Sequence, residues 1–121
     1  MTRLDWEQRI REDYSAEGEF LWARYPDFEI FRHAGNRKWF ALIGTVPLKS
    51  LGLPQEGTLL FMNLKCDPLL IGTLRRKPGF YPAWHMSKTS WITVALDGTV
   101  PEDEIRFLLD RSYGLTAGTK R

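Results

Sequence analysis

The segment Tyr81–Ser90 combines aromatic and cationic side chains, among them Trp84, His85 and Lys88. A lysine on a protruding loop attracts phosphate whatever the base sequence, and an aromatic ring beside it can stack on a base. The segment is too irregular for a core element, and binding residues often lie on such loops. These side chains therefore predict a contact surface for an anionic partner, with DNA as the leading candidate.

Further cations lie in two other turns of the basic middle of the chain. Residues 32–96 carry nine cations and two acids, whereas the segments before and after them are net acidic. Arg37 and Lys38 fall in a predicted hairpin turn, and Arg75, Arg76 and Lys77 end a predicted helix. The helix dipole also favours cations in a last turn, so packing and solvation explain part of this pattern. In the DNA-binding interpretation, the cations of residues 75–77 and Lys88 neutralise phosphates, while Trp84 and His85 make closer contacts.

The same aromatic residues permit an interpretation without nucleic acid. Tyr81, Trp84, His85 and Trp91 could form a pocket for a small ligand, whose binding would depend weakly on salt. Trp39 and Trp91 lie in predicted strands, where the alternative is burial in the core. A third alternative is a protein-interaction module that binds a partner, or a second copy of itself, through an exposed edge strand. The expected oligomeric state is a monomer or a weak homodimer.

Catalytic, metal and cofactor motifs have no support in the sequence. Cys66, His33 and His85 lack metal-ligand spacing, and neither glycine-rich phosphate-loop pattern occurs. We expect Cys66 to be a buried structural thiol, although its place before a helix could lower its pKa. The acids of the first helix are interspersed with arginines, which favours a solvated, salt-bridged face. The prediction is a protein that is no enzyme and has no metal or cofactor.

The composition indicates one folded domain. The chain has 121 residues, 43% of them hydrophobic, with five Trp and seven Phe, and a net charge of +2. This length supports a core without disulfides, and the single Cys66 suits a reducing compartment. No signal peptide or membrane span is recognisable, so we expect a cytoplasmic protein without a membrane partner.

The first half of the chain predicts a helix followed by a β-hairpin. Thr2 and Asp5 match a capping box, and Trp6, Ile10 and Tyr14 then share one helical face. Two aromatic and β-branched runs follow, and Gly35 and Asn36 are expected to supply positive φ in the turn between them. The runs are Phe28–His33 and Trp39–Ile43.

The second half predicts two strands, each followed by a helix. Thr58–Lys65 is apolar on both faces and fits an interior strand, after which Asp67 and Pro68 open a short helix. Trp91–Leu96 predicts another strand. The final helix is expected to be capped by Thr99, to end at Gly114, and to be followed by a frayed tail over residues 116–121. This order predicts an α+β fold, a two-layer sandwich with helices on one face of a mostly antiparallel sheet.

Motifs spread over nearly the whole chain resemble the MmcQ/YjbR family. They are Asn63-Leu-Lys-Cys-Asp-Pro68, His85-Met-Ser-Lys88, Trp91-Ile-Thr-Val94, Leu96-Asp-Gly98, Val100-Pro101 and Ser112-Tyr113. The resemblance implies a CyaY-like fold and DNA binding by a "double wing" of two projecting strand–loop units. It assigns this role to Lys65, His85, Lys88 and Trp91, with 33–38 as one projecting loop. The iron-handling role of CyaY is not implied, because the first helix lacks an uninterrupted acidic ridge.

Overall fold

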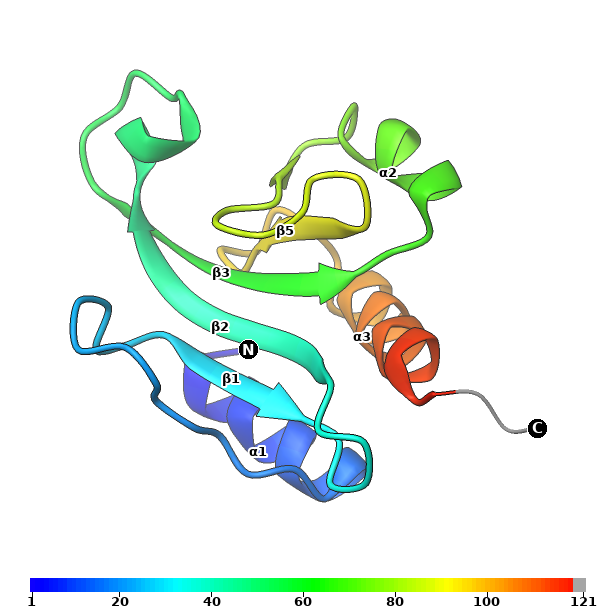
Figure 1. Ribbon diagram of the computed structural model, residues 1–121. Coiled ribbons are helices and arrows are strands. Elements are labelled where there is room, and N and C mark those ends of the chain that lie inside the picture. Colours follow the sequence, from blue (N-terminus) through cyan, green and yellow to red (C-terminus); the bar gives the residue numbers. More distant parts are fainter. Residues whose placement is uncertain (119–121) are drawn as a thin grey trace.

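Three α-helices and a five-stranded antiparallel sheet make up the computed structural model, which describes residues 1–118 (Figure 1). The sheet order is β1-β2-β3-β5-β4, and every neighbouring pair is antiparallel. This arrangement confirms the predicted α+β fold. In chain order, the elements are α1 (Arg3–Tyr14), β1 (Glu29–Arg32), β2 (Trp39–Pro47), the 3-10 turn η1 (Leu48–Leu51), β3 (Thr58–Lys65), α2 (Pro68–Leu74), β4 (Phe80–Pro82), β5 (Trp91–Ala95) and α3 (Glu102–Thr116).

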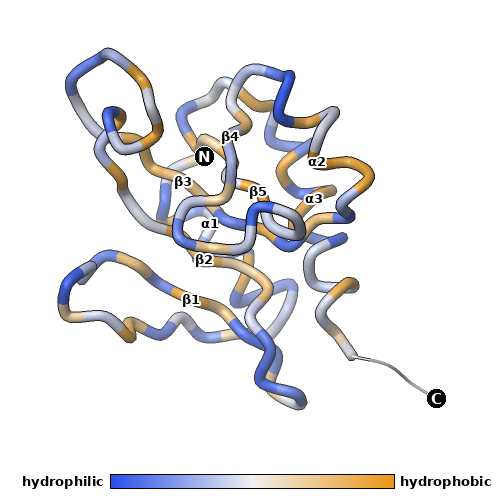
Figure 2. Tube along the Cα trace, turned by 45° about the horizontal axis from the view of Figure 1, so that its top comes forward, coloured by the Kyte–Doolittle hydropathy of each residue, from blue (hydrophilic) through white to orange (hydrophobic). Residues whose placement is uncertain are grey.

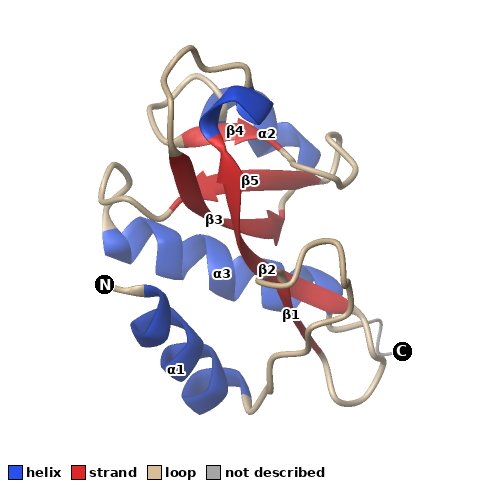
Figure 3. Cartoon of the chain, turned by 90° about the vertical axis from the view of Figure 1, so that its left-hand side faces the viewer, coloured by secondary structure: helices blue, strands red, loops and turns tan. Residues whose placement is uncertain are grey.

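The main core lies between the helices and one face of the sheet, here called the helix face. Figure 3 shows α1 and α3 on the same side of the sheet, and the buried stripe of α2 joins the same cluster. Trp6 and Ile10 of α1 belong to one buried cluster with Phe31 and Ile43 of the sheet, and all four are almost fully buried. Burial of this apolar surface is the largest favourable contribution to folding. The position of the helices on one face of the sheet confirms the predicted helix layer.

Irregular segments cover the opposite face of the sheet, here called the loop face. A second cluster lies there, containing Phe28, Leu42 and Phe61, and partly buried aromatic residues pack against it. The covering segments are residues 20–28, 48–57 and 82–90. The central strands are hydrophobic and the turn between β1 and β2 is hydrophilic along the trace in Figure 2. Successive residues of β3 therefore face two apolar layers, as its continuous apolar sequence predicts.

Several local predictions are confirmed at atomic detail. The Asp5 backbone N–H donates to Thr2 Oγ1 at 3.2 Å while the Thr2 N–H donates to Asp5 Oδ2 at 2.8 Å, which completes the capping box. Asp67 caps α2 by accepting from the Leu69 N–H, and Pro68 is its first residue. β3 has the predicted bounds and lies inside the sheet.

Other predictions of the turns and helix ends were wrong. The positive φ of the hairpin turn belongs to Arg37, at 67°, and neither Gly35 nor Asn36 adopts it. The first residues of α3 lack a side-chain cap; Pro101 holds the N-cap position and Thr99 is not the cap. Three acids in the first turn of α3 complement the helix dipole instead.

The end of the chain is more ordered than expected. Gly114 lies within α3, which continues to Thr116, because the Thr116 hydroxyl is buried and lies 2.9 Å from His33 Nε2. The frayed tail therefore does not begin at residue 116, and its last part, residues 119–121, lies outside the described residues. His33, expected only to form a turn, thus ties the β1–β2 turn to α3.

Two strands differ in extent from the prediction. β2 continues to Pro47, so the first residues of the connection expected over residues 44–57 belong to a strand. The 3-10 turn η1 follows, and the remaining residues lead into β3. β4 was not predicted, because three residues that include a proline carry little strand signal, and pairing with β5 stabilises them.

Within residues 1–118, no helix is long and apolar enough to cross a membrane.

Candidate functional site

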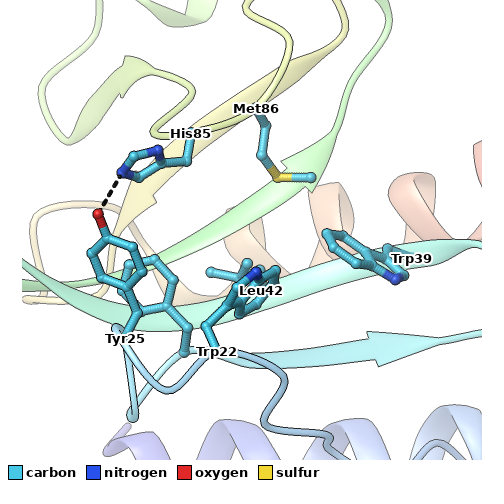
Figure 4. Close-up of a pocket in the computed structure, with 7 residues that line it drawn as sticks. Trp22, Tyr25, Trp39, Leu42, His85 and Met86 are labelled. Atoms are coloured by element: carbon cyan, nitrogen blue, oxygen red, sulfur yellow. Dashed lines mark hydrogen bonds between the residues drawn. The ribbon is translucent and has the colours of Figure 1, made fainter.

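A hollow of about 200 Å³, here called the aromatic pocket, lies on the loop face. Phe28 and Leu42 are buried beneath it, whereas the residues around it are all at least partly exposed. The segment before β1, the first residue of β2 and the loop before β5 meet at this point (Figure 4). The residues around the hollow are Trp22, Tyr25, Trp39, His85 and Met86.

Two aromatic contacts define the ends of the aromatic pocket. At one end, the Tyr25 hydroxyl lies 3.3 Å from His85 Nε2, the dashed contact in Figure 4. At the other end, the rings of Trp22 and Trp39 meet edge to face with centroids 5.5 Å apart. Edge-to-face pairs are a favourable geometry for aromatic rings. The pocket is therefore preformed by contacts among its own residues.

The loop that carries His85 is fixed to the sheet by a buried polar network. Asn63 Nδ2 donates to the Trp84 carbonyl at 2.9 Å, and the Trp84 N–H donates to Thr93 Oγ1 at 2.9 Å. The Thr93 hydroxyl in turn donates to Asn63 Oδ1 at 2.5 Å. His85 follows at a φ of 61°, which costs free energy for a residue other than glycine and persists only where the surroundings enforce it. The network thus explains how His85 is held beside the pocket.

Some of the predicted cations gather in a shallow depression, here called the basic patch. It brings the end of the β1–β2 turn beside the paired strand ends of β3 and β5. Lys65 Nζ lies 5.8 Å from the ring centroid of Trp91, within the range of a cation–π contact. Trp39 borders both the basic patch and the aromatic pocket. The patch consists of Arg37, Lys38, Trp39, Lys65 and Trp91.

The remaining cations of the predicted nucleic-acid surface lie elsewhere. Arg75, Arg76 and Lys77 follow α2, and Lys77 is paired with Glu104 of α3. Lys88 Nζ donates to the Ala83 carbonyl at 3.1 Å, within its own loop. The nine cations of residues 32–96 therefore do not converge on the 81–90 loop.

The four residues of the predicted ligand pocket also separate. Only His85 borders the aromatic pocket, whereas Trp84 borders a depression against η1 and Trp91 borders the basic patch. Tyr81 packs against the loop-face cluster. Trp39 and Trp91 are only partly buried, so core burial describes them incompletely.

Sequence reasoning missed Trp22, Tyr25 and Met86 as members of a site. The signal was an aromatic run over residues 20–25 with no helical or strand periodicity, which is typical of a covering loop rather than of a core element. Tyr25 and His85 are sixty positions apart, so no local pattern could pair them. Phe20 and Leu21, beside Trp22, are exposed as well.

Burial shifts the pKa of Cys66, which the sequence placed before a helix, and of His33 in the β1–β2 turn. Burial raises the pKa of the Cys66 thiol, and the neighbouring Asp67 adds to this, so the helix that follows does not activate Cys66. Burial likewise lowers the pKa of His33. No cluster of three His, Cys, Asp or Glu side chains that could hold a metal ion occurs among residues 1–118.

The family model described as YjbR matches residues 12–115. The chain belongs to the YjbR family. The uncharacterised Bacillus subtilis protein YyaQ is 37% identical over 116 residues, which cover 96% of this chain and 98% of YyaQ. A crystal structure of a Pseudomonas syringae protein superposes with a TM-score of 0.92 at 38% identity, over 96% of this chain and 99% of that one. A Deinococcus radiodurans protein, DR2400, superposes with a TM-score of 0.70 at 26% identity, over 93% of this chain and 81% of that one.

The YjbR family match confirms the resemblance seen in the sequence but carries no established activity, since its named relatives are uncharacterised. The CyaY-like comparison and the double-wing interpretation stay predictions.

The motif residue Ser112 serves the fold. It is fully buried, accepts from the Lys65 N–H at 2.9 Å and donates to the Phe40 carbonyl at 2.6 Å. Ser112 thereby joins β2 and β3 where their own ladder has ended.

Proposed function

We propose that this YjbR-family protein is a non-catalytic binding protein that takes a small planar, apolar ring into the aromatic pocket. The observation that carries the proposal is a preformed hollow on the loop face, surrounded by four aromatic rings and a methionine. Hydrophobic side chains left partly exposed around a concavity are typical of a binding surface. Methionine adapts its shape to a ring and makes favourable sulfur–aromatic contacts.

The size of the pocket limits the ligand. Its volume of about 200 Å³ lies below the range of roughly 300–1,000 Å³ that drug-sized ligands occupy. One or two fused rings fit such a space. A neutral compound of this size reaches a dissociation constant of about 0.1–1 mM, given the usual limits on binding energy per atom.

Calorimetric titration with naphthol tests this function. The expected result is one site with a dissociation constant of about 0.1–1 mM and little dependence on salt. Trp22→Ala removes one side of the pocket and should weaken binding by about tenfold or more, whereas Trp91→Ala, outside the pocket, should leave it unchanged. Absence of binding up to the solubility of naphthol would contradict the proposal.

Nucleic-acid binding is the second candidate, and the basic patch favours it. Arg37, Lys38 and Lys65 lie beside the partly exposed ring of Trp91, a combination suited to phosphate attraction and base stacking. Three phosphate contacts predict that the logarithm of affinity falls with the logarithm of salt at a slope of roughly −2 to −3.

The salt dependence distinguishes this candidate from simple solvation of charges. Lys65→Gln should reduce the slope by about one, and Arg76→Gln, on the distant end of α2, should leave it unchanged. Lys88→Ala tests the wider surface predicted from the sequence. No binding of a DNA duplex or single strand at low salt in a fluorescence-anisotropy titration would refute the candidate.

A further inference from the structure

We infer that the ligand of the aromatic pocket is an aromatic anion, whose phosphate or carboxylate lies on the basic patch while its ring lies in the pocket. This inference rests on the proposed function, because the ring must occupy the pocket first. Its starting point is Trp39, which borders both depressions and so makes them two parts of one surface. A ring with an anionic substituent can fill both parts at once.

The geometry of the pocket gives the ligand a direction. The Tyr25–His85 contact closes the end remote from Trp39, as Figure 4 shows. Phe28 and Leu42 close the pocket from below. A substituent that points past Trp39 from a bound ring faces the cations of the basic patch, because Trp39 borders both depressions.

The cations beside Trp39 are held on a rigid turn. The His33 N–H donates to the Lys38 carbonyl at 2.9 Å, and the Lys38 N–H donates to Asn36 Oδ1 at 2.9 Å. Asn36 Nδ2 also donates to the Thr116 carbonyl at 2.9 Å, which ties the turn to the end of α3. Backbone that is ordered before binding loses less entropy when a ligand arrives, so these cations are suited to hold a small anion.

The cations of the basic patch are also free to bind. Within residues 1–118, Arg37, Lys38 and Lys65 form no ion pair, whereas Lys49 and Lys77 are each paired with a glutamate. Unpaired cations close together repel each other, and a bound anion relieves that repulsion. An arginine and two lysines suit a phosphate or carboxylate, to which they donate charge-assisted hydrogen bonds.

The test compares naphthol with naphthyl phosphate, which share a ring and differ in charge. At low salt, the phosphate should bind at least tenfold more tightly than naphthol, and salt should reduce the difference. The double variant Lys38→Gln/Lys65→Gln should bring the two affinities to within about twofold while leaving naphthol binding unchanged. Arg75→Gln/Arg76→Gln, which removes the same charge from the end of α2, is the matched control and should change neither affinity.

The outcomes separate this inference from the proposed function. Equal affinities for both compounds would overturn the inference and leave the proposed function intact, whereas binding of neither compound would refute both. Inorganic phosphate alone should bind far more weakly than naphthyl phosphate if the ring contributes. A ring with an anion can belong to a free small molecule or to a nucleic-acid strand, and comparing thymidine monophosphate with a short oligothymidine distinguishes the two. Tighter binding of the oligothymidine would assign the ligand to a nucleic-acid strand. Equal affinities would assign it to a free small molecule.

Discussion

Both faces of the sheet carry apolar side chains, but different kinds of segment cover them. On the helix face, regular helices close over the sheet, and Trp6, Phe31 and Phe40 are exposed by 1% or less. On the loop face, irregular segments cover the sheet incompletely and leave Trp22 and Trp39 partly exposed around a pocket. The difference indicates that the helix face encloses the sealed core of the fold, while the loop face leaves aromatic side chains accessible around a concavity.

The strongest test of this contrast compares one large truncation on each face. Phe31→Ala opens a cavity in a sealed core and should lower the free energy of unfolding by about 3–5 kcal/mol. Trp22→Ala removes a larger but partly exposed ring and should cost about 1 kcal/mol. Urea unfolding followed by circular dichroism measures both values. Equal losses would mean that the loop face is as much a structural core as the helix face.

A second test concerns the hydrogen bonds of Ser112. Ser112→Ala leaves the Lys65 N–H and the Phe40 carbonyl without this partner in a buried place and should cost about 2–3 kcal/mol. Ser90→Ala is the control, because it removes a hydroxyl that donates to Ser87 Oγ at 3.3 Å and leaves the Ser90 carbonyl in place, so it should change stability by less than about 0.5 kcal/mol. A negligible effect of Ser112→Ala would show that the ladder between β2 and β3 closes without it.

A third test uses a buried carboxyl pair under α1. Burial, followed by the hydrogen bond and charge of Glu7, raises the pKa of Glu29 to about 7, whereas its hydrogen bond with Glu29 and then Arg3 lowers the pKa of Glu7. Because folded Glu29 keeps a proton that the unfolded chain releases near pH 4.5, the free energy of unfolding should fall as pH rises from about 4.5 through about 7 and level off above that range.

The variant Glu29→Gln checks this pH dependence. The native protein should lose about 1–2 kcal/mol of stability between about pH 5 and pH 8, and the variant should lose much less over the same interval. Denaturant titrations at several pH values give both curves. If the stability of the native protein rose over this interval, Glu29 would not keep its proton in the folded state.

The smallest expected change belongs to the loop face. Tyr25→Phe removes the hydroxyl that contacts His85 and keeps the ring that stacks on Phe28, with centroids 4.7 Å apart. The partly exposed bond should contribute less than about 1 kcal/mol to stability. Thermal unfolding measures the change, and a larger loss would mean that the Tyr25–His85 contact supports the fold rather than the edge of the pocket.

The sequence predicted the regular half of the molecule because its signals are local. Capping residues and apolar periodicity located α1, α2 and β3, and the helix face follows from them. The aromatic pocket was not predictable in the same way, since Trp22 and His85 meet only after the sheet has formed. The loop of residues 81–90 was recognised as important, and in the structure its Trp84 and Lys88 border a depression against η1 rather than the aromatic pocket.

The five tryptophans can report directly which face of the sheet binds a ligand. Their indole N–H resonances can be followed by two-dimensional ¹H–¹⁵N NMR during a titration with naphthol, after assignment by single Trp→Phe variants. The Trp22 and Trp39 signals should move in a saturable manner, while the signal of Trp6, sealed on the helix face, should stay in place. Unchanged Trp22 and Trp39 signals, or a response at Trp6 alone, would contradict the claim that the loop face holds the binding site.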